Sequence, residues 1–253
     1  MEKRMLAPAE LCESFYGIGE RKAGLPLGRM LVLAIYGGMF IALAGVASTW
    51  ASMLVENLSL RRLIAGCVFP AGLAMVVITG VELFTGNNLM TIAWLEKRIT
   101  LKAMLRNWGV VYFGNLIGAV LIAALAVFGG VFNGNESVLL SAAAGKIMPF
   151  FPALFRGILC NILVCMGVLM AGAAKDAAGK VIAQFFPVAA FVMAGYEHCV
   201  ANMYYFSAAI FADSGVLTVG QLLQNMVPVT LGNIIGGGIV LGAGYWYGYR
   251  AKQ

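Results

Sequence analysis

Three ionisable side chains interrupt stretches of the sequence that are otherwise apolar. Glu82 stands within the run 63–95, and Glu197 and His198 stand side by side within the run 181–212. Each run is too long and too interrupted for one straight helix, so we expect a helix break near each charge. A carboxylate in lipid must be neutral or hydrogen-bonded. The two glutamates therefore either accept backbone N–H groups freed by the breaks or handle protons.

His198 is the only histidine in the chain, and an ionisable group inside a membrane is a functional candidate. An imidazole titrates at about pH 6.5, so it can supply a positive charge or a proton to a small anion. The alternative is a buried residue whose polar atoms are satisfied. With no second histidine and no ligand spacing among the five cysteines, we expect neither a metal site nor a cofactor. The chain also offers no catalytic set of an enzyme.

Two neutral groups and one lysine complete the candidate site. Thr85 lies beside the first expected break, and Asn161 lies within an apolar run. Each can replace part of the hydration of an anion, or can equally satisfy a neighbouring helix. Lys146 stands in a segment with few charges, where it either attracts anions or keeps its ammonium at the membrane surface.

The elements that hold these residues must be membrane-spanning helices. Hydrophobic residues form 61% of the chain, charged residues only 11%, and the mean hydropathy is +0.89. Such a chain has too little polar surface for a water-soluble globule. Four charge-free runs of spanning length join the two interrupted runs; they are 30–53, 107–135, 157–174 and 214–249. Unbroken apolar runs also exclude a transmembrane β-barrel. We predict an all-α integral membrane protein with six transmembrane helices, the second and fifth of them broken.

The net charge of +6 reflects membrane orientation rather than nucleic-acid binding, because the basic residues cluster at span ends. With six spans and a cytoplasmic N-terminus, every basic residue lies inside except Arg61, Arg62, Lys146 and Arg156. This bias predicts both termini in the cytoplasm. Residues 1–28 mix charges with large apolar side chains, so we expect an amphipathic segment on the cytoplasmic surface.

The sequence contains one three-span unit twice. Glu82 and Glu197 align at an offset of 115, together with the glycine and asparagine residues around them. NWGVVYFGNLIG at 107–118 matches NMVPVTLGNIIG at 225–236 in six of twelve positions. A unit that crosses the membrane an odd number of times must repeat from the opposite side, so the sequence predicts an inverted 3+3 repeat.

The repeat sets the expected organisation. A single transport domain, 1–253, holds the first repeat at 29–135 and the second at 146–250. The substrate path lies between the halves, next to breaks that we place at about 84–88 and 198–202.

Small residues form two further ridges, Gly114-xxx-Gly118 and Gly232-xxx-Gly236. Such ridges let helices approach closely, either within one chain or between protomers.

Five segments carry a family resemblance; they are ELFTGNN at 82–88, NWGVVYFGNLIG at 107–118, GILCNILVCMGV at 157–168, GYEHCVANMYYF at 195–206 and LGNIIGG at 231–237. Over essentially its whole length, the chain resembles the formate/nitrite transporter family, which includes the hydrosulfide channels. The resemblance implies an aquaporin-like protomer, a homopentamer with one pore in each protomer, and a bacterial or archaeal inner membrane. It also implies small monovalent anions as substrates, namely hydrosulfide, formate or nitrite, and the ELFTGNN wording is closer to the hydrosulfide and formate branches.

The resemblance also implies roles for individual residues. Leu73, Leu83 and Phe84 resemble the cytoplasmic constriction, and Phe69 and Phe191 resemble the periplasmic one. His198 corresponds to the central histidine, Thr85 to the threonine of the first broken helix and Asn161 to the pore asparagine. Lys146 matches the vestibule lysine when one gap is allowed before Gly157. The main alternative is a neutral-solute pore of the aquaporin or glycerol-facilitator type, although the paired NPA motifs of that family are absent.

Overall fold

The computed structural model describes residues 5–213 and 215–250, which are almost entirely helical. The elements in chain order are α1 (Pro8–Ala23), α2 (Leu27–Ser52), α3 (Leu58–Val68), α4 (Pro70–Thr79), α5 (Phe84–Asn87), α6 (Met90–Leu95), α7 (Leu101–Phe128), α8 (Glu136–Ala144), α9 (Phe150–Ala173), α10 (Ala177–Ala194), α11 (Cys199–Ala212), α12 (Val219–Ile234), the π-helix η1 (Ile235–Ala243) and α13 (Gly244–Tyr249). Met5 and Ala174 form an isolated β-bridge.

Six helical segments of this described part are long and apolar enough to cross a membrane. They are Leu27–Ser52, Leu58–Thr79, Leu101–Phe128, Phe150–Ala173, Ala177–Ala194 and Val219–Tyr249. Large apolar side chains on their outer faces are exposed, among them Phe113 (63%), Phe128 (72%) and Phe186 (66%). Lipid or another protomer must cover these faces. The predicted class is confirmed: the chain is an all-α, multi-pass membrane protein.

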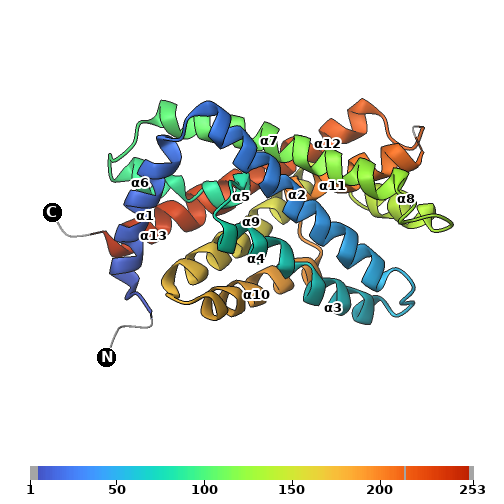
Figure 1. Ribbon diagram of the computed structural model, residues 1–253, viewed down its shortest axis with the longest axis horizontal. Helices are drawn as coiled ribbons and strands as arrows, with labels where there is room; N and C mark the ends of the chain where they lie inside the picture. Colours follow the sequence, from blue (N-terminus) through green and yellow to red (C-terminus); the bar gives the residue numbers. More distant parts are fainter. Residues whose placement is uncertain (1–4, 214, 251–253) are drawn as a thin grey trace.

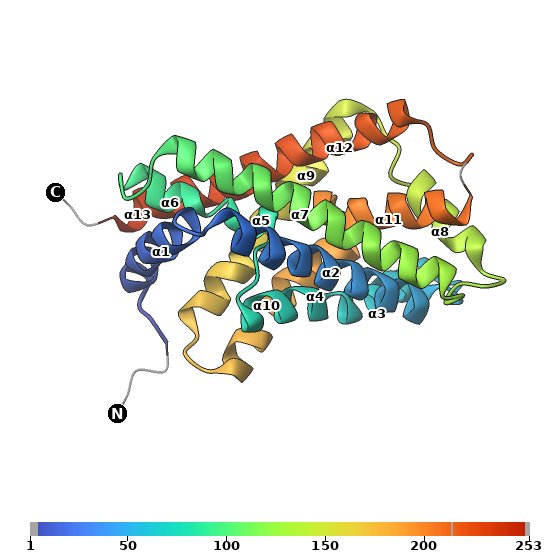
Figure 2. The same cartoon turned by 45° about the horizontal axis from the view of Figure 1, so that its top comes forward.

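Most of the long helices run roughly along the long axis of the molecule, whereas α1 lies across it at one end (Figures 1 and 2). Near both termini, α1 packs against α6 and α13. The opposite end carries α8 and the start of α3. We call these the α1 end and the α8 end. Of the amphipathic segment expected in residues 1–28, residues 8–23 form helix α1 at one end of the bundle, and residues 1–4 lie outside the described part.

Two of the membrane segments are interrupted by short extended stretches. Helix α4 ends at Gly80, whose φ is 71°, and α10 ends at Gly195, which has the same φ. Glycine adopts this left-handed conformation without a Cβ clash, so it stops the helix at that point. Helix α5 then begins at Phe84 and α11 at Cys199. The interruptions, 80–83 and 195–198, thus begin ahead of the predicted windows 84–88 and 198–202, because the glycines end the helices before the charges.

The small-residue ridges pack inside the protomer. A Cβ added to Gly118 of α7 would collide with the carbonyl oxygen of Ile35 in α2, and one on Gly236 would collide with the carbonyl oxygen of Ile158 in α9. The glycines therefore bring α7 against α2, and the α12–η1 segment against α9, at backbone distance. Of the two interpretations that the sequence left open, the structure supports packing within one chain.

Candidate functional site

Asparagine side chains hold the two extended stretches in place. The Asn115 amide of α7 donates to the carbonyl oxygens of Ala34 and Glu82, and its oxygen accepts the N–H of Phe84 at 2.9 Å. In the other half, Asn233 donates to the carbonyl oxygens of Gly157 (2.8 Å) and Glu197 (3.0 Å) and accepts the N–H of Cys199 (2.9 Å). Of the two roles open to the glutamates, acceptance of backbone N–H groups at the breaks belongs to Asn115 and Asn233 instead. The repeated segments 107–118 and 225–236 could have revealed these asparagines.

The two restarting helices meet at a buried pair of side chains. Thr85 Oγ1 of α5 lies 2.9 Å from His198 Nε2, and the two residues are 0% and 2% exposed. His198 caps α11, because its Nδ1 accepts the backbone N–H of Ala201 at 3.0 Å. A ring that accepts at Nδ1 carries its proton on Nε2, so His198 donates to the Thr85 hydroxyl. The hydroxyl proton of Thr85 can then be donated in turn.

Aromatic rings cover this pair on the side of the α8 end. Phe191 stacks on the His198 ring with a centroid distance of 5.8 Å and an interplanar angle of 16°. Phe69 meets Phe191 edge to face, again at 5.8 Å. Both phenylalanines are 4% exposed. Phe69 and Phe191, the two side chains expected to form a constriction, thus contact each other, and Phe191 also stacks on His198.

On that side lies a cavity of about 570 Å³, the outer cavity, lined by Lys146, Glu197, His198, Phe69 and Phe191 among others. The Lys146 ammonium lies 3.3 Å from Glu197 Oε2, and the same oxygen accepts from Asn202 at 2.7 Å. Asn202 also donates to Asn225 Oδ1 at 2.8 Å. The sequence-predicted residues Lys146 and Glu197 therefore form one ion pair within the cavity wall.

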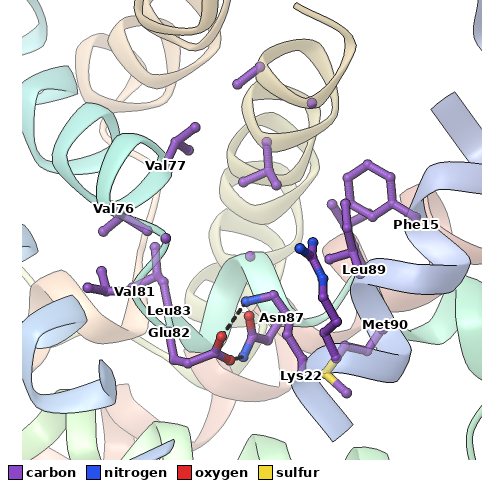
Figure 3. Close-up of a pocket in the computed structure, with 18 of the residues that line it drawn as sticks. Phe15, Lys22, Val76, Val77, Val81, Glu82, Leu83, Asn87, Leu89 and Met90 are labelled. Atoms are coloured by element: carbon purple, nitrogen blue, oxygen red, sulfur yellow. Dashed lines mark hydrogen bonds and ion pairs between the residues drawn. The ribbon is translucent and has the colours of Figure 1, made fainter. Parts of the chain in front are cut away.

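A second cavity of about 390 Å³, the inner cavity, opens toward the α1 end. Figure 3 shows Leu83, Val76 and Val77 on one wall and Phe15 of α1 on the other. Leu73 also lines it. The two leucines expected at a constriction thus bound this cavity. Phe84, which was grouped with them, packs edge to face on Tyr112 at a centroid distance of 5.0 Å.

The inner cavity repeats the ion pair of the outer one. Lys22 of α1 lies 2.7 Å from Glu82 Oε1, and Asn87 donates to Glu82 Oε2 at 2.6 Å (Figure 3). Asn87 donates to Asn107 Oδ1 at 2.8 Å. Lys22, Glu82, Asn87 and Asn107 therefore match Lys146, Glu197, Asn202 and Asn225 in arrangement. Sequence reasoning missed Lys22, because it lies before the first repeat and has no partner at the common offset.

Asn161 is completely buried and connects three segments. Its amide nitrogen lies 3.2 Å from the Thr85 carbonyl oxygen, 2.8 Å from Asn88 Oδ1 and 2.7 Å from the Asn233 carbonyl oxygen. An amide group has only two hydrogens, so these acceptors already use its donors. Asn161 is thus next to the Thr85–His198 pair and fixes the backbone at Thr85.

Comparison with known proteins identifies the family of this chain. The family model described as "Formate/nitrite transporter" matches residues 9–247. The chain belongs to the formate/nitrite transporter family. It is 40% identical to "Uncharacterized transporter YrhG" of Bacillus subtilis (strain 168), over 97% of this chain and 94% of that one. It is 37% identical to "Formate channel BtFdhC" of Bacillus thuringiensis, over 97% and 96%.

Solved structures of this family superpose closely on the chain. One described as "FNT family ion channel" aligns with a TM-score of 0.88 and 32% identity, covering 94% of this chain and 98% of that one. Another, "Pentameric formate channel with formate bound", aligns with a TM-score of 0.78 and 33% identity, covering 89% and 98%. The family expected from the sequence segments is therefore confirmed.

Proposed function

We propose that this chain forms a channel for formate and other small monovalent anions in the cytoplasmic membrane of a bacterium or archaeon. Relatives named as formate channels support a small anion as substrate. The pentameric formate channel among the similar structures supports a homopentamer with one pore in each protomer. In this proposal both termini are cytoplasmic, the α8 end is periplasmic, and the chain is one transport domain built as an inverted pair, 29–135 and 146–250, after the cytoplasmic segment 1–28.

The observation that carries the proposal is the buried Thr85–His198 pair between the outer and inner cavities. An anion that leaves water needs hydrogen-bond donors that replace its hydration without trapping it. Here the His198 Nε2–H donates to the Thr85 oxygen, and the Thr85 O–H is left to donate to the anion. One neutral donor, strengthened by a second behind it, binds weakly enough to release.

The path has apolar walls on both sides of this donor. Phe69 and Phe191 strip water from an anion that arrives from the outer cavity, and Leu73 and Leu83 do so from the inner cavity. Hydrated metal cations and large solutes are excluded, because such walls offer nothing in exchange for their hydration.

The proposed channel is pH-dependent through His198. An anion at Thr85 favours the imidazolium form of the neighbouring ring, so anion binding and protonation are coupled. The additional proton must go to Nδ1, which then loses the hydrogen bond from the Ala201 N–H. Protonation of His198 therefore costs the hydrogen bond that caps α11, so it occurs mainly when an anion is present.

One transport assay tests the proposal. Purified protein in liposomes should take up labelled formate, hydrosulfide and nitrite across a pH series, with formate uptake dependent on the protein. Glycerol uptake without anion uptake would overturn the proposal in favour of the neutral-solute pore. The family match, which names anions, does not favour that alternative.

A further inference from the structure

The outer cavity is lined by more positively charged side chains than its one carboxylate can neutralise. Arg61, Arg62, Arg156 and Lys146 line it, and Glu197 is its lining carboxylate. The Lys146 ammonium lies 3.3 Å from Glu197 Oε2 and 4.9 Å from the centre of the Tyr205 ring. Its charge is therefore compensated within the wall. Attraction of anions, one of the two roles open to Lys146, therefore comes from the arginines.

Within the part of the chain that the structure describes, the three arginines have no carboxylate partner. Among residues 5–213 and 215–250, the side-chain ion pairs join Lys22 to Glu82, Arg98 to Glu20 and Lys146 to Glu197. Arg61 uses its Nε to hold the Val55 carbonyl oxygen at 2.7 Å, which fixes the guanidinium and leaves its outer nitrogens available. All three residues are exposed and line the cavity.

The Gly195 turn brings one of these arginines to the break before His198. A Cβ added at Gly195 would lie 3.6 Å from Arg62 Nη2, so the guanidinium covers a turn that has no side chain of its own. Across the cavity, Ser137 and Ser141 of α8 add hydroxyl groups to the wall. Guanidinium groups pair with tetrahedral oxyanions through two parallel hydrogen bonds, and hydroxyl groups can complete such a site.

We propose that Arg61, Arg62 and Arg156 form a binding site for a doubly charged tetrahedral oxyanion in the outer cavity. Such an ion cannot continue past Phe69 and Phe191, because the cost of removing its hydration is much greater than that for a monovalent anion. It stays at the arginines and competes with smaller anions for the mouth of the path. The blocking effect rests on the proposed function, whereas the binding does not.

Sulfate is the probe for the binding experiment. Calorimetric titration of the purified, assembled protein at constant ionic strength should give saturable sulfate binding. The double variant Arg61→Gln/Arg62→Gln should bind at least about tenfold more weakly, the loss expected when charge-assisted hydrogen bonds are removed. Arg29→Gln, which removes an exposed arginine at the α1 end, is the matched control and should bind like the wild type. Equal affinity in the double variant would overturn the proposal, and Arg156→Gln repeats the test at the third arginine.

Formate uptake into liposomes tests the blocking effect. External sulfate should inhibit formate uptake by the wild type, and the double variant should need about tenfold more sulfate for the same inhibition. Phosphate, whose charge decreases at acidic pH, should lose potency there while sulfate keeps it. Sulfate that binds at the arginines without affecting formate uptake would overturn the blocking effect. Sulfate binding in a protein that transports no formate would instead overturn the proposed function and leave this site intact.

Discussion

His198 Nε2 lies 2.9 Å from Thr85 Oγ1, and this hydrogen bond joins the two halves of the sequence where their interrupted helices restart. Since Nδ1 of the ring accepts the Ala201 N–H, the bond has a direction, from the ring nitrogen to the hydroxyl oxygen. The hydroxyl proton of Thr85 has no acceptor among the described residues. A donor of this kind, buried between two cavities, is what an anion path requires.

Thr85→Val should therefore reduce formate uptake by about tenfold or more, because valine keeps the shape of threonine and removes the donor. The His198 Nε2–H also loses its buried acceptor, which should cost about 1–3 kcal/mol of stability. Uptake and thermal unfolding of the purified variant measure the two effects. Thr79→Val is the control, because the exposed Thr79 hydroxyl bonds the carbonyl oxygen of its own helix. Wild-type uptake by a folded Thr85→Val would remove Thr85 from the path.

The spans were predictable from the sequence because each needs only a long apolar run, which is a local property. The positions of the helix breaks were harder to predict than the spans. We placed the breaks after the charged residues 82 and 197, whereas Gly80 and Gly195, both in the left-handed conformation, end the helices earlier. The repeat offset already linked Glu82 to Glu197 and Asn87 to Asn202, whereas Asn107 and Asn225 correspond only through the separate match of 107–118 with 225–236.

The partners of these residues depend on tertiary contacts that no spacing encodes. Lys22 reaches Glu82 only because α1 folds back over the inner cavity, 60 positions away in the sequence. Asn161 was recognised as a polar residue in an apolar run. Its role follows from acceptors in two other segments, α5 with its cap Asn88 and α12, which meet only in the folded chain.

Leu83→Ala should raise formate uptake and loosen the size selection, because it removes bulk from the wall of the inner cavity. Acetate uptake relative to formate uptake measures the selection. Leu83 is 2% exposed, so the change should also cost about 2–5 kcal/mol of stability. Leu60→Ala, at a position 48% exposed, controls for the loss of a leucine at a remote site. If both selectivity and uptake stay unchanged in folded Leu83→Ala, this leucine does not constrict the path.

Removal of the Lys22 ammonium should destabilise the protein by leaving Glu82 unpaired. Fully buried pairs lose about 3–5 kcal/mol when one partner is removed, and the loss here should be nearer 1–3 kcal/mol. The lower value follows because the Lys22 side chain is 23% exposed. Lys22→Met should unfold at lower temperature, and Lys22→Met/Glu82→Gln should recover part of the loss. If Lys22→Met/Glu82→Gln loses as much free energy of unfolding as the two single variants together, the two groups do not act as a pair.

Two glycines of α7 should respond oppositely to alanine. At Gly118 a Cβ would meet the backbone of α2, so Gly118→Ala should destabilise the protomer by about 1–3 kcal/mol or more. At Gly109 a Cβ would meet nothing within 4 Å. Gly109→Ala should be neutral or stabilise by up to about 1 kcal/mol, because alanine favours the helix. Thermal unfolding measures both. Normal protomer stability in Gly118→Ala, with only its assembly weakened, would show that the ridge serves contacts between protomers.

His198→Phe tests the pH dependence of the proposed path. Phenylalanine keeps an aromatic ring under Phe191 but removes the proton on Nε2 and the acceptor at Nδ1. Loss of the cap on α11 should cost about 1 kcal/mol, which a membrane protein of this size should tolerate. Formate uptake should become insensitive to pH between about 5 and 8, the range in which an imidazole titrates.

Protonation of the ring and anion binding are coupled only while His198 is present, so acidification should no longer change the uptake of formate relative to nitrite in His198→Phe, since both anions stay ionised in this range. Uptake across a pH series in liposomes, with assembly checked by gel filtration, provides the measurement. Asn202 should keep its bonds to Glu197 and Asn225, so a change in pH response cannot be assigned to collapse of that network. A folded His198→Phe with the wild-type pH profile for every anion would make His198 a packing residue and refute the proposed coupling.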